Sequence, residues 1–244
     1  MAASLRTRLF VEPPLLTGAT VPLRPEQVHY LRNVLRLAPG VEIAVFNGRD
    51  GEWIARIDDL GKERGSVIPD RKLRDQTCPP DVWLLFAPIK RDAIDLVAEK
   101  SSELGASRIW PVMTKHTDVS RVNVERLAAN AMEAAEQSER LCIPEVREPV
   151  DLPKLLAEWP ADRPLIVCAE IGDAKPIAEV IAPLPRGPVA ILIGPEGGFA
   201  RSELDLILAK PFAHPARLGP RILRAETAAF AALTCWQALK GDWV

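Results

Sequence analysis

From Val82 onward, short apolar runs alternate with segments in which apolar residues recur at helical spacing. Strands that alternate with helices are typical of a parallel sheet, because each parallel connection needs a crossover segment long enough to hold a helix. The pattern therefore predicts an α/β domain over most of the chain, ended by a helix over Glu226–Leu239. The expected strands are Val82–Ile89, Ile109–Met113, Pro164–Ala169, Val189–Ile193 and Ala216–Leu218.

The strand Val189–Ile193 leads into a glycine-rich turn, Gly194–Phe199. Its glycines let the backbone turn sharply and let another molecule approach it closely. Ligands of α/β sheets bind beyond the carboxyl ends of the strands, so this turn is a candidate ligand loop. A second exit of the same kind, Leu218-Gly219-Pro220, precedes the final helix. For either loop taken alone, a plain strand-to-helix turn is the alternative.

Residues 1 to about 75 have the pattern of a small β-rich domain. Val41–Phe46 alternates apolar and polar residues, Asn47-Gly48 predicts a tight turn, and a second strand begins at Trp53. A further short strand is expected at Ser66–Ile68. Residues 71–81 are polar and contain a proline pair, so we expect a linker there. We accordingly divide the chain into domains 1–75 and 76–244.

The segment His29–Leu37 has apolar residues at helical spacing, and Arg32 and Arg36 lie four positions apart, so we expect them on one helix face. The first 40 residues carry five arginines against two acidic residues, whereas the whole chain has a net charge of −2. A basic region of this kind favours contact with an RNA backbone. A solvated helix face is the alternative for the two arginines.

The four cysteines, Cys78, Cys142, Cys168 and Cys235, are scattered without the paired spacing of a metal site, and we expect buried, unreactive thiols. The three histidines form no metal-binding pattern, so we expect no metal. No apolar run approaches the roughly 20 residues of a membrane helix. The first ten residues lack the apolar core of a signal peptide. These features predict a cytoplasmic protein without a membrane partner.

The two glycine-containing loops together resemble the SPOUT superfamily of methyltransferases, in particular the bacterial family that methylates N3 of a uridine in small-subunit ribosomal RNA. Gly194–Phe199 matches the family motif GPEGGF, and Leu218–Ala228 matches LG…ILRxETA. The stretches His29–Arg36 and Glu133–Arg140 match further family signatures. The resemblance implies a small PUA-like β-barrel at the N-terminus, a trefoil knot in the C-terminal parallel sheet, and a homodimer. It also implies S-adenosylmethionine as cofactor and 16S rRNA of the 30S subunit as substrate.

The same resemblance implies roles for residues of both domains. Arg224 is expected to stabilise the negative charge on the uracil, and Glu196 and Glu226 are candidate proton acceptors. For Glu226, a stabilising role at the helix N-terminus is the alternative. The expected cofactor-binding residues are Ala169, Glu170, Ile193, Gly194, Pro195, Glu196, Gly197, Gly198, Leu218, Gly219, Ile222, Leu223, Arg224, Thr227 and Ala228. The expected RNA contacts are Arg6, Arg8, His29, Arg32, Arg36, Lys90 and Arg91.

Two positions depart from the family pattern: Tyr30 follows His29 where many relatives have a second histidine, and Ala200 follows the first loop. Ala200 stands where relatives often carry Ser or Thr as a helix cap, and Ser202 is the alternative cap. Two other functions compete with methyl transfer. A non-catalytic RNA-binding factor in ribosome assembly is disfavoured by the presence of Arg224 and both glycine-containing loops. A nucleotide-phosphate enzyme is disfavoured because neither GxxxxGK[ST] nor GxGxxG occurs in these loops.

Overall fold

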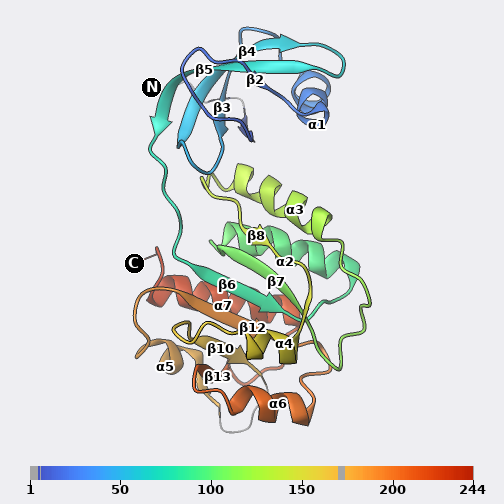
Figure 1. Ribbon diagram of the computed structural model, residues 1–244, viewed down its shortest axis with the longest axis vertical. Coiled ribbons are helices and arrows are strands. Elements are labelled where there is room, and N and C mark those ends of the chain that lie inside the picture. Colours follow the sequence, from blue (N-terminus) through green and yellow to red (C-terminus); the bar gives the residue numbers. More distant parts are fainter. Residues whose placement is uncertain (1–4, 6, 170–173, 244) are drawn as a thin grey trace. The chain divides into compact units, whose positions relative to one another are not determined.

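The computed structural model describes residue 5 and residues 7–169 and 174–243, and for Arg91 and Asp92 it describes the backbone alone. The chain forms two compact units. Unit 1 joins the residues up to Cys78 with Ala135–Ile143, and unit 2 joins Pro79–Ala134 with the residues from Pro144 onward (Figure 1). Within the described residues, no helix is long and apolar enough to cross a membrane.

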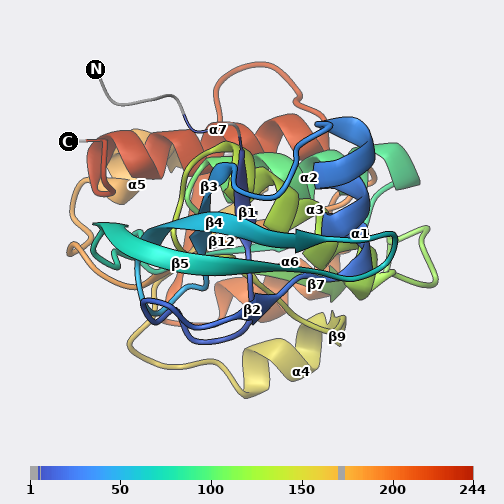
Figure 2. The same cartoon turned by 90° about the horizontal axis from the view of Figure 1, so that it is seen from above.

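Unit 1 is built on a five-stranded sheet with the strand order β1-β3-β4-β5-β2. β1 runs parallel to β3 and the other pairs are antiparallel; β4 and β5 form a long ribbon (Figure 2). A short helix and a π-helical turn contribute Val28 and Leu31 to its apolar core. This arrangement confirms the expected PUA-like β-rich fold. Its elements are β1 (Arg8–Phe10), β2 (Val21–Pro22), α1 (Pro25–His29), η1 (Tyr30–Val34), β3 (Glu42–Phe46), β4 (Glu52–Leu60) and β5 (Gly65–Arg74).

Two local predictions for unit 1 were wrong. Residues 71–74 belong to β5 and not to a linker, because Lys72 and Arg74 pair with Trp53 and Glu52 of β4. Backbone pairing with a long partner strand outweighs the polar composition of this stretch. Arg32 and Arg36 do not share a helix face, because η1 ends at Val34 and Arg36 has a φ of 54°.

The expectation of four free thiols is corrected as well. Cys78 and Cys142 form a disulfide that joins two segments 64 residues apart within unit 1. Cys168 and Cys235 are free and half-buried. Burial raises the pKa of the Cys168 thiol to about 12. This thiol is therefore protonated at neutral pH, which agrees with the prediction of an unreactive thiol at Cys168.

Unit 2 contains a sheet in which every described pairing is parallel, as the alternating pattern predicted. The strand order is β11-β13-β10-β12-β6-β7-β8, and β9 pairs with β7. Its strands are β6 (Val82–Phe86), β7 (Arg108–Met113), β8 (Glu145–Val146), β9 (Val150–Asp151), β10 (Leu165–Cys168), β11 (Lys175–Pro176), β12 (Val189–Ile193) and β13 (Ala213–Arg217). Its helices are α2 (Arg91–Glu103), α3 (Val124–Gln137), α4 (Leu152–Ala157), α5 (Ile177–Ile181), α6 (Arg201–Leu208) and α7 (Ala225–Leu239).

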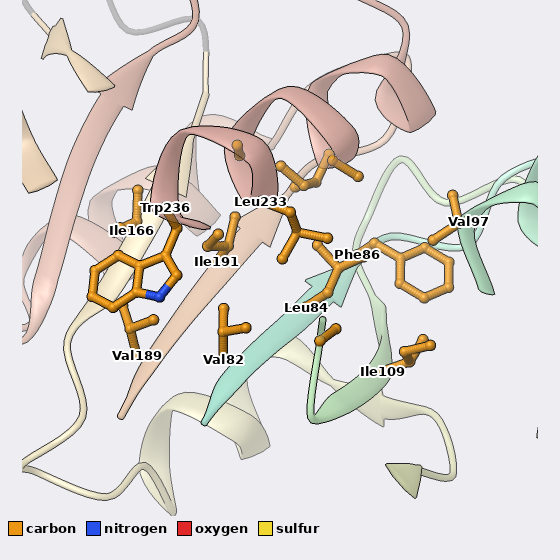
Figure 3. Close-up of a cluster of buried hydrophobic side chains, with 14 of the residues drawn as sticks. Val82, Leu84, Phe86, Val97, Ile109, Ile166, Val189, Ile191, Leu233 and Trp236 are labelled. Atoms are coloured by element: carbon orange, nitrogen blue, oxygen red, sulfur yellow. The ribbon is translucent and has the colours of Figure 1, made fainter. Parts of the chain in front are cut away.

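Both faces of this sheet are covered, which explains why β12 is apolar at every position. Val189 and Ile191 pack with α7 residues in one core, and Ala190 and Leu192 pack in a second core with residues of α4 and α6. Figure 3 shows the first core, where Leu233 of α7 lies against side chains from β6 and β12. Burial of one such side chain stabilises the fold by about 1.5–3 kcal/mol. The paired cores therefore hold the strand ends rigidly in place.

Candidate active site

A cavity of about 540 Å³ lies at the carboxyl ends of β10, β12 and β13. β10 is hydrogen-bonded to both other strands and all three run parallel, so their carboxyl ends meet at one edge of the sheet. Ala169, Gly194 and Leu218 are the first residues beyond these three strands, and all three line the cavity. The site therefore forms where an α/β sheet is expected to bind its ligand.

The first loop, Gly194–Phe199, is shaped by its buried phenylalanine. A Cβ atom on Gly194 would lie 2.9 Å from the Phe199 ring, so the close packing of this ring requires glycine at position 194. Phe199 is 8% exposed, and Gly198 has a φ of 66°, which favours glycine. The loop thus has one well-packed side chain and a backbone that lines the cavity.

The side chain of Glu203 compensates for the absence of a capping side chain at Ala200. One carboxylate oxygen of Glu203 accepts a hydrogen bond from the backbone N–H of Ala200 at 2.9 Å. The other accepts one from the backbone N–H of Lys115 at 2.8 Å. Ser202 is not the cap, since its hydroxyl accepts a hydrogen bond from the Lys115 Nζ at 2.8 Å. The start of α6 is therefore stabilised by a buried carboxylate that also holds the turn after β7.

That turn, Thr114–Thr117, contacts the first loop a second time. The Nδ1 atom of His116 lies 3.2 Å from the carbonyl oxygen of Gly197 and 3.0 Å from that of Gly198. β7 lies two strands from β12 in the same parallel sheet, so its carboxyl end reaches the same edge. The role of His116 could not be predicted from the sequence, because nothing local to residues 114–117 indicates a contact some 80 residues away.

The second loop, Leu218–Arg224, is far more exposed. Gly219 has a φ of 100°, and the Ile222 side chain is 83% exposed although it lines the cavity. Arg221 and Arg224 are also exposed. Among the residues that the structure describes, the Arg224 guanidinium has no hydrogen-bond or ion-pair partner, so its donors are available to a ligand.

The structure brings most of the predicted cofactor residues together around this cavity. Arg224 and Thr227 do not line the cavity. At the start of α7, the residues that line it are Ala225 and Ala228, which lie three positions apart on one helix face. Glu170 lies outside the described residues. The predicted residues that line the cavity are Ala169, Ile193, Gly194, Pro195, Glu196, Gly197, Gly198, Leu218, Gly219, Ile222, Leu223 and Ala228. The lining residues that sequence analysis missed are Cys168, Phe199, Leu204, Ala216, Arg217, Arg221 and Ala225.

The three predicted catalytic residues stand on the two loops and on α7. Glu196 is exposed and lines the cavity. Glu226 is half-buried in the first turn of α7, where a carboxylate interacts favourably with the helix dipole. Within the described part of the chain, no hydrogen bond or ion pair joins Glu196, Glu226 and Arg224.

The predicted RNA contacts differ in how available they are. In unit 1, Arg32 is exposed and donates a hydrogen bond to the carbonyl oxygen of Gly61 at 2.8 Å, and Arg36 is exposed beyond the end of η1. His29 is exposed, and its Nδ1 lies 2.9 Å from the Nδ2 of Asn33. In unit 2, Lys90 is exposed at the N-cap of α2. Arg6 and the side chain of Arg91 lie outside the description.

Arg8 is bound inside unit 1. Its guanidinium pairs with Glu52, which also pairs with Arg74 at 2.6 Å, and it donates to the carbonyl oxygen of Ala135 at 2.8 Å. Burial opposes ionisation of Glu52, but its hydrogen bonds to the two arginines lower the pKa of this carboxyl group. The Arg8 side chain is only 9% exposed, which favours a structural role over an RNA contact.

The chain is similar to RNA methyltransferases over most of its length. Residues 76–237 match the family model of an RNA methyltransferase domain, and residues 23–70 match that of an RNA methyltransferase PUA domain. The ribosomal RNA small subunit methyltransferase E of Rickettsia conorii is 33% identical over 93% of this chain and 93% of its own length. The protein of that name from Synechocystis is 33% identical over 95% of this chain and 77% of its own length.

Solved structures show the same similarity. The ribosomal RNA small subunit methyltransferase E of Neisseria gonorrhoeae, crystallised with S-adenosyl methionine bound, has a TM-score of 0.88 and 29% sequence identity to this chain. The match covers 98% of this chain and 99% of that one. The similarity thus includes both units and the loops around the cavity.

Proposed function

Because the chain belongs to the family of small-subunit ribosomal RNA methyltransferases E, we propose that it transfers a methyl group from S-adenosylmethionine to N3 of one uridine in 16S rRNA. The observation that carries the proposal is the meeting of two motif-bearing loops, Gly194–Phe199 and Leu218–Arg224, around one cavity. Each loop alone is a common strand-to-helix turn, whereas their combination matches the motifs of the family.

The residues around the cavity fit the cofactor. Its volume of about 540 Å³ falls within the roughly 300–1,000 Å³ of small-molecule sites. Ile193, Leu218 and Leu223 supply apolar walls for an adenine ring, and Gly194 and Gly219 let the backbone approach closely. When bound, S-adenosylmethionine supplies an activated methyl group on a sulfonium leaving group.

The remaining chemistry belongs to the chain. The uracil N3 is a poor nucleophile while it carries its proton, so the site must accept that proton and stabilise the anion. Arg224 offers a planar set of charged donors suited to an anion shared between N3 and a neighbouring oxygen. Glu196 and Glu226 are the proposed proton acceptors. The exposed position of Arg224 lets it reach an RNA base without first breaking an internal contact.

We assign RNA binding chiefly to residues 1–75 and methyl transfer to residues 76–244. Arg32 and Arg36 are predicted RNA contacts of this part, and both are exposed, which suits contact with phosphate groups. The double variant Arg32→Ala with Arg36→Ala should weaken RNA binding. The slope of the logarithm of the binding constant against the logarithm of the salt concentration should become less steep by about 0.7–0.9 for each lost phosphate contact. Calorimetry with S-adenosylmethionine serves as the control, and cofactor affinity should not change.

We further propose a homodimer in the cytoplasm, formed largely by the C-terminal domain, and a trefoil knot in that domain. α7 is rich in alanine, and small side chains permit close helix packing. The exposed Ile222 and Leu239 belong to the second loop and to α7, so a partner subunit could cover both. Sedimentation at micromolar concentration tests the dimer, and a fully active monomer would contradict it.

The deciding experiment is methylation of 30S subunits, and of free 16S rRNA, from a strain that lacks this activity. We expect transfer of one methyl group to a single uridine, located by mass mapping of the digested RNA. The alternative of a non-catalytic assembly factor predicts RNA binding without turnover. Wild-type protein that neither binds the cofactor nor methylates RNA would favour that alternative.

A further inference from the structure

The contact between His116 and the first loop has no role in the function proposed so far. His116 is exposed on the turn Thr114–Thr117, yet its Nδ1 lies within 3.2 Å of two carbonyl oxygens, those of Gly197 and Gly198. A side chain on an exposed turn ordinarily has no fixed partner. Here the imidazole is held against the backbone that lines the cavity.

The partners of Nδ1 determine how the ring carries its protons. A carbonyl oxygen only accepts hydrogen bonds, so the Nδ1 atom must carry the hydrogen. The neutral ring then has its free lone pair on Nε2, and the protonated ring keeps the same Nδ1–H donor. The contact with Gly197 and Gly198 therefore persists in both charge states of His116.

The turn that carries His116 is itself fixed. Thr117 donates its backbone N–H to the Thr114 carbonyl oxygen at 3.1 Å, and the two threonine hydroxyls lie 2.9 Å apart. The backbone N–H of Lys115 is held by the buried carboxylate of Glu203. The imidazole is thus presented from a rigid base, which is what orientation of another group requires.

The contact acts on the backbone of the cofactor loop. Gly197 and Gly198 line the cavity, and their carbonyl groups are the ones that accept from His116. A Cβ atom on Gly197 would lie 3.4 Å from the His116 Cβ, so the side chain also packs closely against this residue. Fixing a carbonyl group fixes the plane of its peptide unit, including the N–H on the other side.

We propose that His116 is a positioning residue of the methyl-transfer site. Its Nδ1–H holds the Gly197 and Gly198 peptide groups in the conformation that binds the cofactor, and it takes no part in proton transfer. The inference rests on the function proposed above, because it concerns the same cavity. It adds a residue from the turn after β7 to a site otherwise built from the ends of β10, β12 and β13, the two loops, α6 and α7.

The test compares two substitutions at this position in the full-length protein. His116→Ala removes the donor, whereas His116→Asn places an amide N–H close to the position of Nδ1. Loss of the hydrogen bonds should weaken S-adenosylmethionine binding about tenfold in the alanine variant, with a smaller fall in kcat. The asparagine variant should bind within about threefold of wild type. Asp118→Ala, at an exposed position just beyond this turn, is the matched control and should leave both quantities unchanged.

Calorimetry gives the cofactor affinity, and methyl transfer to 30S subunits gives kcat and KM at several pH values. Equal losses in the alanine and asparagine variants would overturn the proposal, as would a fall in kcat at unchanged cofactor affinity. If Nε2 instead accepts the uracil proton, His116→Asn should lose most of its turnover while cofactor affinity is kept, and the pH dependence of the remaining turnover should differ from that of the wild type. Positioning predicts the same pH profile for both proteins.

The outcome also separates this proposal from the function on which it rests. Wild-type protein that binds no cofactor and methylates no RNA would contradict methyl transfer itself. Wild-type protein that is active, together with a fully active His116→Ala variant, would contradict only the positioning role. Thermal unfolding of each variant checks that the exposed substitution leaves the fold intact.

Discussion

Two loops border the same cavity, but they are held in different ways. The first, Gly194–Phe199, is packed by a buried phenylalanine and hydrogen-bonded to the turn after β7. The second, Leu218–Arg224, presents an isoleucine side chain that is 83% exposed and two exposed arginines. The first loop has the features of a preformed binding surface, and the second has side chains still available to a partner.

The difference suggests a division of labour within one site. A preformed loop lowers the entropic cost of binding, so it suits a cofactor that must be bound in every catalytic cycle. A loop with unpaired donors suits a group whose interactions form only with the substrate present. Changes in the first loop should therefore alter cofactor affinity, and changes at the exposed Arg224 of the second loop should alter turnover.

The largest effect is expected from the second loop. Arg224→Lys keeps the charge but loses the planar set of donors, so we expect turnover to fall about a hundredfold or more. Cofactor affinity should remain within about threefold of wild type, because Arg224 does not line the cavity. Calorimetry and methyl transfer to 30S subunits measure the two quantities. Parallel losses of affinity and turnover would mean that Arg224 only holds its own loop in shape.

The second largest effect is expected from a substitution that disturbs the packing of the first loop. Gly194→Ala would place a Cβ atom 2.9 Å from the buried Phe199 ring, and the ring has little room to move. Overpacking of this kind costs about 1–3 kcal/mol, and we expect cofactor affinity to fall about tenfold. Gly197→Ala is the control for thermal stability. The added Cβ atom would lie 3.4 Å from the His116 Cβ, at van der Waals contact, so its melting temperature should fall less than that of Gly194→Ala. Similar melting temperatures for the two variants would contradict this account of the loop.

A smaller effect is expected where Glu203 joins α6 to the turn after β7. Glu203→Gln replaces one of two acceptor oxygens by an amide donor, which leaves one backbone N–H without a partner. Loss of one such hydrogen bond costs about 0.5–1.5 kcal/mol of unfolding free energy, because both bonds are only partly buried. Denaturant titration measures the loss. An unchanged midpoint would show that these hydrogen bonds do not hold the first loop.

The smallest effect is expected from Ile222→Ser in the second loop. The side chain is 83% exposed, so the free energy of unfolding of the subunit should change by no more than about 0.5 kcal/mol. If the proposed dimer covers Ile222, the same substitution should weaken association, which sedimentation detects. A marked loss of subunit stability would show that the second loop is more tightly packed than its exposure indicates.

Some elements could be predicted from the sequence because their signals are local. β12 spans Val189–Ile193 as expected, since a strand buried on both faces has an unbroken apolar run. The final helix was expected over Glu226–Leu239 and spans Ala225–Leu239. The two glycine-containing loops were found in the same way, because turn residues that follow an apolar run mark the end of a strand.

Other features depend on residues that only the tertiary structure brings together. The disulfide between Cys78 and Cys142, the burial of Arg8 against Glu52, and the contact of His116 with the first loop all join distant parts of the chain. The polar residues 71–74 extend β5 because β4 lies beside them.

The physical reason is the range of the interactions. Apolar periodicity and turn chemistry act over a few residues, so the sequence by itself determined the alternation of strands and helices and the two loops of the site. Hydrogen bonds and ion pairs depend on which side chains meet after the strands have paired. Strand pairing therefore decided which turn supports the first loop, and left Arg224 of the second loop without an internal partner among the described residues.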